Sequence, residues 1–409
     1  NIEMRVTFIH PDLGIGGAER LVVDAATALS RKGHDVTVVT NQFDPSHSFQ
    51  ECEQLKIVPV LMWLPKSLFS RFYALCAYIK MVLAAIYTVL FIESDVLIAD
   101  QISACLIILR FFSRSRLIFY CHYPDLLLTD REGSFKSIYR KLIDWVEAST
   151  VGLAHVICVN SNFTASVVRR TFPHLAARRL EVLYPSLNTK FFDACEGRQP
   201  EGIPEGISHI FVSLNRFERK KNIELAIDSF IELSKRAPRA DFEKCLLVIA
   251  GGYDRRNEEN LVYHRQLKEY ALTSRINSRQ FLFLRSPSDE QKMWLLRQAR
   301  AVLYTPSNEH FGIVPLEGMY MRTPVIAVRS GGPVETIVHR KTGFLVEPNP
   351  KQFAECMCEL VESQDVGKAL GDLGRKRVIK LFSFESFGEQ LDSLLCPEVQ
   401  GDTHHSKGN

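Results

Sequence analysis

The stretch from Met4 to Thr40, MRVTFIHPDLGIGGAERLVVDAATALSRKGHDVTVVT, decides the fold. The apolar run Met4–Ile9 fits a buried strand, the glycines that follow it fit a tight loop, and Ala18–Arg31 has the spacing of an amphipathic helix. Gly33 ends that helix, and Val36–Thr40 supplies a second strand. The order of strand, glycine loop, helix and strand predicts a βαβ unit, and therefore an α/β fold with a parallel sheet.

The same alternation continues along the chain of 409 residues, which is long for a single core. In the first half we expect further strands at Val96–Ala99, Leu117–Cys121, Val156–Asn160 and Leu180–Leu183. In the second half we expect strands at Ile210–Leu214, Leu246–Ala250, Phe281–Leu284, Ala301–Tyr304 and Pro324–Val328, and helices at Ile223–Arg236, Asn260–Leu272, Val366–Leu381 and Ser386–Leu395.

A change in composition separates the two halves. The segment Asp193–Ser208, DACEGRQPEGIPEGIS, is rich in glycine, proline and glutamate, which is typical of a linker between domains. We therefore expect an N-terminal Rossmann-like domain over residues 1–192, a linker over 193–208, a C-terminal Rossmann-like domain over 209–382, a closing helix over 383–396 and a disordered tail over 397–409.

Charge and cysteine content exclude some classes of partner and compartment. The chain has 50 basic and 47 acidic residues, so its net charge of +3 creates no global field that favours nucleic acid. None of the ten cysteines forms a C-x-x-C pair, which predicts buried, reduced thiols in a protein that faces the cytosol. The sequence opens at Asn1, and no apolar leader precedes the first strand, so we expect no cleaved signal peptide.

The apolar segment 72–92 is long enough to raise the question of a membrane span. Lys80 lies near its centre, where a cation costs about 2.5–3.5 kcal/mol, and a crossing there would separate the first βαβ unit from the rest of its sheet. We therefore favour a helix in the membrane interface, with Arg71 and Lys80 reaching lipid headgroups. A helix buried in the domain and a spanning helix are the alternatives. Aromatic and basic residues at 63–65 and 111–116 also favour a surface that meets lipid.

The glycine loop after the first strand is the first candidate binding site. It begins like G-x-G-x-x-G, but Glu19 replaces the third glycine and the second strand ends without an acid for a ribose, so we do not expect NAD. The backbone N–H groups of Gly16 and Gly17 at a helix N-terminus suit a phosphate or a sugar hydroxyl. Glycines that serve only a tight turn are the alternative.

His122 is the second candidate in the first half. It follows the predicted strand Leu117–Cys121, and ligands gather at the carboxyl ends of parallel strands. A structural histidine is the alternative, but this position favours a function.

The second half carries a cluster of cations in the sequence NRFERKKN, residues 215–222. Arg216 offers a forked contact and Lys221 a point charge at a junction between strand and helix, where the helix dipole also favours an anion. We expect these groups to hold a diphosphate, and a solvated basic turn is the alternative. The next strand ends in Gly251 and Gly252, which let a nucleotide approach the backbone.

The most specific motif is NEHFGIVPLE, residues 308–317. Pro315 suits the first position of a helix, which would place Glu309 in the loop and Glu317 in the first helical turn. Backbone amides between the two glutamates would cradle phosphate. They belong to Phe311, Gly312, Ile313 and Val314.

Glu309 and Glu317, with seven residues between them, match the E-x(7)-E signature of retaining GT-B glycosyltransferases. The sequence also resembles that class in its first glycine loop, in its two cations and in Gly331-Gly332. Finer matches narrow the resemblance to the eukaryotic α-1,3/1,6-mannosyltransferases of the asparagine-linked glycosylation pathway, and they cover nearly the whole chain. The matching segments are HPDLGIGGAERLV, CHYPDLLLT, YPSLN, RFERKKN, VIAGGYD and YTPSNEHFGIVPLEGMYM.

This resemblance implies a GT-B fold, in which two Rossmann-like domains face each other across a cleft. It implies transfer of mannose from GDP-mannose to a dolichol-diphosphate-linked oligosaccharide, as its second and third mannoses, at the cytosolic face of the endoplasmic reticulum membrane. Other mannosyltransferases of the pathway are candidate partners, and no metal or other cofactor is expected. The alternatives are another retaining GT-B transferase, a nucleotide-sugar epimerase with a different donor, and a GT-B scaffold without activity.

The resemblance also implies a role for each candidate residue. Arg216 and Lys221 neutralise the leaving diphosphate, Glu317 binds the ribose, and Glu309 contacts the transferred mannose. Catalysis involves Glu309 and His122, which faces the mannose from the acceptor-binding domain together with Gly16 and Gly17. The donor pocket is completed by Gly251, Gly252, Phe311, Gly312, Ile313 and Val314.

Overall fold

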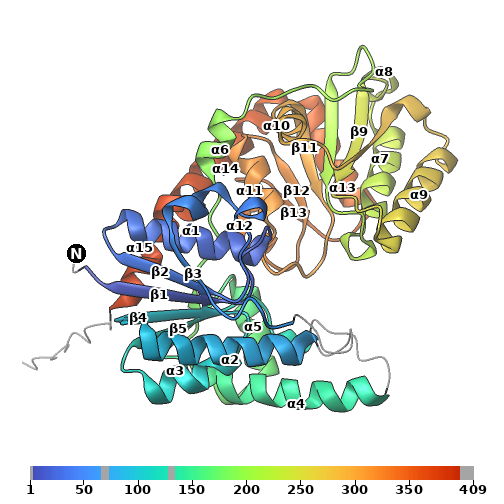
Figure 1. Ribbon diagram of the computed structural model, residues 1–409. Coiled ribbons are helices and arrows are strands. Elements are labelled where there is room, and N and C mark those ends of the chain that lie inside the picture. The colour runs from blue at the N-terminus through green and yellow to red at the C-terminus, as the bar shows by residue number, and fades with distance from the viewer. Residues whose placement is uncertain (1–2, 66–72, 128–133, 397–409) are drawn as a thin grey trace, which may run out of the picture. The chain divides into compact units, whose positions relative to one another are not determined.

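The computed structural model describes residues 3–65, 73–127 and 134–396 (Figure 1). The chain divides into two compact units, and each is described by itself. The first unit holds the described residues up to Asn160, the segment Thr164–Pro185 and the described residues from Glu385 on. The second unit holds Ser161–Phe163 and Ser186–Phe384.

A seven-stranded sheet forms the centre of the first unit, and every pairing in it is parallel. The strand order β3-β2-β1-β4-β5-β6-β7 runs outward in both directions from the neighbours β1 and β4, which makes the gap between their carboxyl ends the topological switch point. The strands are β1 (Arg5–His10), β2 (Asp35–Thr40), β3 (Lys56–Pro59), β4 (Val96–Asp100), β5 (Arg116–Cys121), β6 (Val156–Val159) and β7 (Glu181–Val182).

Helices cover both faces of this sheet (Figure 1). Side chains alternate along β1, so Val6 and Phe8 pack with α1 and α15, while Ile9 packs with α2 and α3 on the other face. The helices are α1 (Gly17–Arg31), α2 (Tyr73–Phe91), α3 (Leu106–Phe112), α4 (Ser134–Thr150), α5 (Asn162–Thr171) and α15 (Phe384–Leu395), and the 3-10 segments are η1 (Pro45–His47), η2 (Gln50–Gln54), η3 (Ser103–Cys105), η4 (Asp125–Leu127), η5 (Val151–Leu153) and η6 (Pro173–Leu175).

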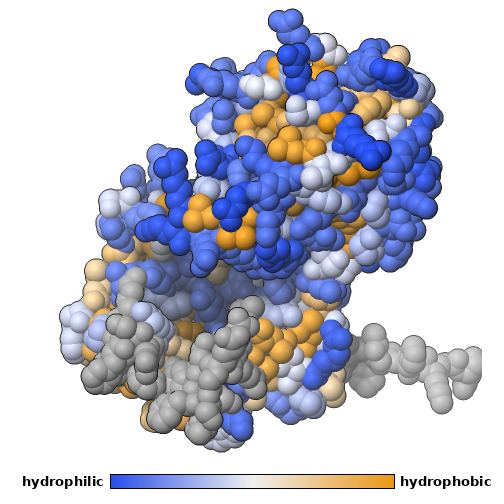
Figure 2. Space-filling model, turned by 90° about the vertical axis from the view of Figure 1, so that its right-hand side faces the viewer, coloured by the Kyte–Doolittle hydropathy of each residue, from blue (hydrophilic) through white to orange (hydrophobic). Residues whose placement is uncertain are grey.

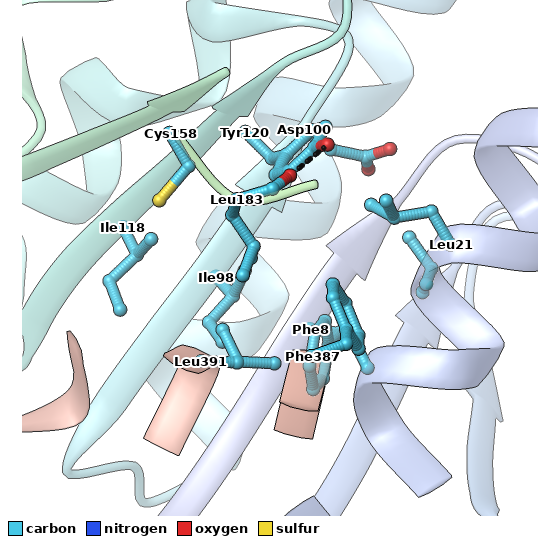
Figure 3. A pocket seen from close by; sticks show the side chains of 12 residues that line it. Phe8, Leu21, Ile98, Asp100, Ile118, Tyr120, Cys158, Leu183, Phe387 and Leu391 are labelled. Carbon is cyan, nitrogen blue, oxygen red and sulfur yellow. Dashed lines mark hydrogen bonds between the residues drawn. The ribbon is translucent and has the colours of Figure 1, made fainter. Parts of the chain in front are cut away.

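The last described helix, α15, returns to the first unit. Phe387 and Leu391 enter the core beneath the sheet and line a cavity of about 20 Å³ (Figure 3). Polar contacts also hold α15 to the first unit: Asp392 Oδ1 lies 2.9 Å from His34 Nε2, and Arg116 Nε donates to the Leu394 carbonyl over 3.0 Å. A segment from the end of the sequence therefore completes the N-terminal fold.

Helix α2 covers the predicted membrane segment 72–92 except Phe72, which, like Arg71, lies outside the described residues. It is long and apolar enough to cross a membrane by length and composition, although 39% of its most apolar window is buried within the unit. Met81 packs against the sheet, whereas Phe91 is 70% exposed. The expectation that Lys80 reaches lipid headgroups is wrong, because Lys80 lies on the face that packs against the protein and is 7% exposed.

The second unit contains a six-stranded parallel sheet with the order β10-β9-β8-β11-β12-β13, so its switch point lies between β8 and β11. The strands are β8 (His209–Leu214), β9 (Cys245–Gly251), β10 (Phe281–Arg285), β11 (Ala299–Tyr304), β12 (Val325–Val328) and β13 (Phe344–Val346). All strands expected from the sequence are present, with ends shifted by one or two residues.

Helices again lie on both faces, with α7, α9 and α13 on one and α10, α11 and α14 on the other (Figure 1). The helices are α6 (Thr189–Ala194), α7 (Glu224–Arg236), α8 (Arg239–Phe242), α9 (Glu258–Thr273), α10 (Asp289–Gln298), α11 (Ile313–Tyr320), α12 (Pro333–Thr336), α13 (Pro350–Glu362) and α14 (Gln364–Phe382), with 3-10 segments η7 (Arg219–Lys221) and η8 (Ser278–Gln280).

The segment 193–208 lies within the second unit, which the chain enters between Pro185 and Ser186. Arg198 N donates to the Glu290 carbonyl over 3.0 Å, and a Cβ on Gly197 would lie 3.0 Å from Trp294 Cα. Gly197 therefore allows this segment to pack closely against α10. The expected disordered tail, 397–409, lies outside the described residues.

Candidate active site

The loops after β8 and β11 carry the predicted cation and the first predicted glutamate. Because these strands are neighbours, both loops emerge at the switch point of the second sheet. There Lys221 Nζ donates to Glu309 Oε1, and Thr305 Oγ1 donates to the Lys221 carbonyl over 2.7 Å. The two charged side chains are 12% and 21% exposed, so the ion pair lies at the surface of the fold rather than inside it.

Arg216 lies in the same loop as Lys221 and is much more accessible. Its side chain is 65% exposed, and its Nη1 lies 3.3 Å from Glu218 Oε1. Lys220 also pairs with Glu218, at 3.2 Å, and is 68% exposed. The loop therefore presents an exposed guanidinium beside a lysine that is held in place.

Glu317 lies deeper than expected, because α11 starts earlier than the proline suggested. The helix begins at Ile313 behind Gly312, whose φ of 80° closes the loop, so Pro315 is the third helical residue and Glu317 lies in the second turn. The two predictions that Pro315 opens the helix and that Glu317 lies in its first turn are wrong. Proline is accepted at its actual position because the first-turn N–H groups have no acceptor within the helix.

The environment of Glu317 indicates that this side chain binds a ligand. The residue is 7% exposed, and its Oε1 accepts from Lys292 Nζ of α10 over 2.7 Å. Its buried Oε2 has no hydrogen-bond partner among the described residues. A buried carboxylate oxygen without a partner is costly, so a donor from a bound molecule would satisfy it. Lys292 was not predicted from the sequence, because a lone lysine on a helix belongs to no recognisable binding motif.

The glycine turns around these loops allow backbone segments to touch. A Cβ on Gly251 would lie 1.8 Å from the Asn215 carbonyl oxygen, and a Cβ on Gly332 would lie 2.0 Å from that of Phe311. Gly332 N also donates to the Glu309 carbonyl over 2.8 Å. The turn that holds Gly331 and Gly332 thus fixes the loop that carries Glu309. Gly252 lies beside the Arg216 side chain, whose Cγ would be 3.2 Å from an added Cβ.

In the first unit, the predicted residues also gather at the carboxyl edge of a sheet. Gly16 and Gly17 open α1 directly after β1, and nothing lies within 4 Å of a Cβ placed on Gly17. His122 follows β5, is 25% exposed, and has its Nε2 3.0 Å from Asp100 Oδ2. Asp100 was not predicted, although a carboxylate that ends the apolar strand VLIAD is a recognisable signal.

Two parallel α/β sheets, each with predicted binding residues at its carboxyl edge, are typical of glycosyltransferases with two Rossmann-like domains. Comparison with known proteins supports this class. Two sequence families match: Glycosyltransferase Family 4 over residues 15–191 and Glycosyl transferases group 1 over residues 197–377. Sucrose-phosphate synthase from Thermosynechococcus elongatus has a similar structure, with a TM-score of 0.73 and 19% identity, covering 96% of this chain and 98% of that one. Anabaena Alr3699/HepE in complex with UDP-glucose has a TM-score of 0.64 and 18% identity, covering 96% and 99%. The fold is that of the GT-B glycosyltransferases, as predicted.

Sequence relatives narrow the class. The alpha-1,3/1,6-mannosyltransferase ALG2 of Mus musculus is 48% identical over 393 residues, which cover 94% of each chain, and that of Homo sapiens is 47% identical with the same coverage. The protein belongs to the ALG2 family of alpha-1,3/1,6-mannosyltransferases. The predicted family and the predicted glycosyltransferase activity are confirmed.

Proposed function

We propose that the protein transfers mannose from GDP-mannose to a dolichol-diphosphate-linked oligosaccharide, as its second and third mannoses in α-1,3 and α-1,6 linkage. One observation carries the donor half of this proposal: Lys221 and Glu309 pair at the switch point of the second sheet. Ligands of open α/β sheets bind at that point. Membership of the family supports the acceptor half.

The diphosphate of the donor is proposed to bind Lys221 and Arg216. Lys221 is fixed by its loop, and the exposed guanidinium of Arg216 is accessible to a second phosphate. Two cations beside the leaving diphosphate stabilise the negative charge that grows on it as the glycosidic bond breaks. The proposal therefore requires no bound metal.

Glu317 is proposed to hold the ribose of the nucleotide. Its buried Oε2 needs a donor, and a ribose hydroxyl supplies one, while Lys292 holds the carboxylate in place through Oε1. Gly251 lets its strand end pack against the Asn215 backbone, and Gly252 lies beside Arg216, so both place the main chain next to the proposed diphosphate site. The amides at the start of α11, from Phe311 to Val314, face the anionic part of the donor.

Glu309 is proposed to contact the transferred mannose. Its ion pair with Lys221 makes it a weak nucleophile, so attack by the acceptor on the face that the diphosphate leaves is favoured over a covalent intermediate. Both routes retain the anomeric configuration. Donor and acceptor must meet away from bulk water, because water would otherwise take the mannose.

The acceptor is proposed to bind the first unit. Gly17 leaves its backbone open, and His122 presents an imidazole at the same sheet edge. Both groups suit sugar hydroxyls, which donate and accept hydrogen bonds.

A membrane surface is proposed to bind the helices of the first unit. Hydrophobic side chains gather over the lower part of the molecule in Figure 2, where Figure 1 places α2 and α4. Tyr73, Leu90, Phe111 and Trp145 are each at least 60% exposed. We place this surface at the cytosolic face of the endoplasmic reticulum, a location in keeping with ten free cysteines.

The test is transfer from a panel of nucleotide sugars to the dolichol-diphosphate-linked oligosaccharide. We expect product with GDP-mannose and less than a hundredth of that rate with UDP-glucose or UDP-galactose. Equal turnover of a uridine donor would contradict the proposed donor, and absence of transfer to any lipid-linked acceptor would contradict the proposed acceptor.

A matched pair of arginine variants tests the site itself. Arg216→Ala should raise the KM for the donor and lower kcat, because one of the two cations on the diphosphate is lost. Arg256→Ala removes an arginine that is 92% exposed in the next loop and pairs with Asp254, and it should leave transfer unchanged. Equal effects of the two variants would contradict a specific role for Arg216.

A further inference from the structure

Three side chains form a buried chain of contacts at the switch point of the first sheet. His10 ends β1, Asp100 ends β4 and His122 follows β5. His10 Nδ1 lies 2.7 Å from Asp100 Oδ1, and His122 Nε2 lies 3.0 Å from Asp100 Oδ2. The other nitrogen of His10, Nε2, lies 2.9 Å from the Asp12 carbonyl oxygen.

The partners of His10 determine its charge. A carboxylate and a carbonyl oxygen only accept hydrogen bonds, so both ring nitrogens of His10 donate and the ring is an imidazolium. Burial is the largest influence and disfavours that cation, but the attraction and hydrogen bond of Asp100, together with Glu19 and the Asp12 carbonyl, raise the pKa of His10. Burial likewise opposes ionisation of Asp100, but His10 and His122 outweigh it and lower the pKa of Asp100 to about 2.

The surroundings explain why Asp100 needs both histidines. It is 3% exposed and lines the apolar cavity beside Ile98 and Leu21 (Figure 3). A carboxylate in such a place is stable only when its charge is balanced and its oxygens accept hydrogen bonds. His10 balances the charge through one carboxylate oxygen, and the other oxygen of Asp100 accepts from His122.

We propose that Asp100 and His10 are positioning residues: Asp100 accepts from Nε2 of His122 and so fixes the orientation of its ring, which leaves Nδ1 to face a sugar hydroxyl. The proposal rests on the proposed role of His122 in the transfer. His10 is needed because it balances the buried charge of Asp100 and holds its other oxygen, and without it the carboxylate would not stay in place to accept from His122.

Three further titratable groups lie near His10, Asp100 and His122, and none of them supplies a positive charge that could replace that of His10. Glu19 of α1 places its Oε1 4.0 Å from His10 Nε2 and adds to the field that keeps His10 protonated. Burial raises the pKa of the Cys105 thiol to about 12, and it also holds the pKa of the Tyr120 phenol, whose ring lies 4.8 Å from that of His122, well above its usual value. Both therefore remain neutral at physiological pH.

The direct test is the ¹⁵N NMR spectrum of His122 in the intact wild-type enzyme, assigned with His122→Gln. We expect a protonated Nε2 whose proton is hydrogen-bonded to Asp100, and an unprotonated Nε2 would overturn the proposal. This measurement does not depend on the folding of any variant at the other two positions.

Kinetic variants separate positioning from a structural role. Asp100→Asn should lower transfer by about 10–100-fold, and it should cause no further loss in the background of His122→Ala, because it acts through that ring. His10→Gln should lower transfer less than Asp100→Asn does, and it too should cause no further loss in the background of His122→Ala. Additive losses for either variant in a folded enzyme would refute the positioning role.

The outcome for His122→Ala distinguishes the two proposals. If His122→Ala keeps full activity, the proposed role of His122 in the transfer fails. If it loses activity while Asp100→Asn adds its own separate loss, the role of His122 stands and the positioning by Asp100 fails.

Discussion

The switch points of the two sheets carry the same kind of contact at different depths. In the second unit, Lys221 pairs with Glu309 between β8 and β11, and both side chains remain partly exposed. In the first unit, His10 pairs with Asp100 between β1 and β4, and their side chains are 0% and 4% exposed. Sheet topology thus brings opposite charges together twice, once where a ligand can reach them and once where it cannot.

This difference separates two ways in which a charge serves a reaction. An accessible cation can contact a diphosphate while it remains beside its carboxylate partner, so it binds substrate directly. A buried pair is neutral as a whole and acts through a neighbour, as proposed for His122. The same fold therefore provides a binding site in one unit and support for a single side chain in the other.

The largest expected effect tests the accessible pair. Lys221→Ala should lower kcat by about 10²–10³-fold, because one group that stabilises the leaving diphosphate is lost. Lys220→Ala, the control on the adjacent residue, removes a lysine that is 68% exposed and should change the rate less than twofold. The melting temperatures of both variants should stay close to that of the wild type. Similar transfer rates for the two variants would contradict a direct role of Lys221 at the diphosphate.

A second prediction concerns a buried acid near the acceptor side. Glu147 of α4 accepts from the N–H groups of Asp125 and Leu126 over 2.7 and 3.0 Å, and burial raises its pKa to about 7. A carboxyl whose pKa is raised on folding stabilises the fold fully below its unfolded value of 4.5, and that stability is lost as the pH rises through 7.

Glu147→Gln should therefore be as stable as the wild type at pH 4.5 and more stable at pH 8, by at most about 3 kcal/mol. Unfolding in denaturant at the two pH values measures the difference, and hydrogen exchange of α4 shows whether it resides in the first unit. Identical pH dependence in both proteins would contradict the assignment.

A third prediction compares one glycine from each unit. Gly332→Ala places a Cβ 2.0 Å from the Phe311 carbonyl oxygen and should lower the free energy of unfolding by about 1–3 kcal/mol. Gly17→Ala meets nothing within 4 Å, so its stability should not fall. If acceptor approaches the backbone there, the KM for the acceptor rises instead. Equal melting temperatures for the two variants would show that the turns are equally open.

The smallest expected effect is on membrane binding. Phe111 and Phe112 are 71% and 70% exposed at the end of α3, and replacing both with serine should lower recovery on anionic vesicles severalfold. Leu272→Ser, at a residue that is 67% exposed in the second unit, is the control and should have no effect. If the two substitutions behave alike, lipid binding is not confined to the first unit.

The sequence was most informative where a local pattern and the fold agree. Short apolar runs predicted most strands of both sheets, because a buried parallel strand is apolar throughout. The edge strands β3 and β13 were missed, since Lys56–Pro59 carries a charge and a proline and Phe344–Val346 has only three residues. The start of α11 was misplaced because Gly312 closes the loop two residues before the proline can.

The site was predictable only in part, for a similar reason. Lys221, Glu309 and Glu317 stand in a contiguous motif or next to a strand end, so spacing revealed them. Lys292 and Asp100 act through residues that are distant in sequence, and only the folded sheet brings them together.

The return of α15 to the first unit has a consequence for synthesis on the ribosome. Phe387, Leu391 and Leu395 are among the last residues of the described chain to leave the exit tunnel, yet they cover the face of a sheet whose first strand emerged among the first. The second unit, which is nearly contiguous in sequence, has all its strands before then. The first unit is thus completed after the strands of the second, and its uncovered sheet must be kept from aggregating until α15 has been synthesised.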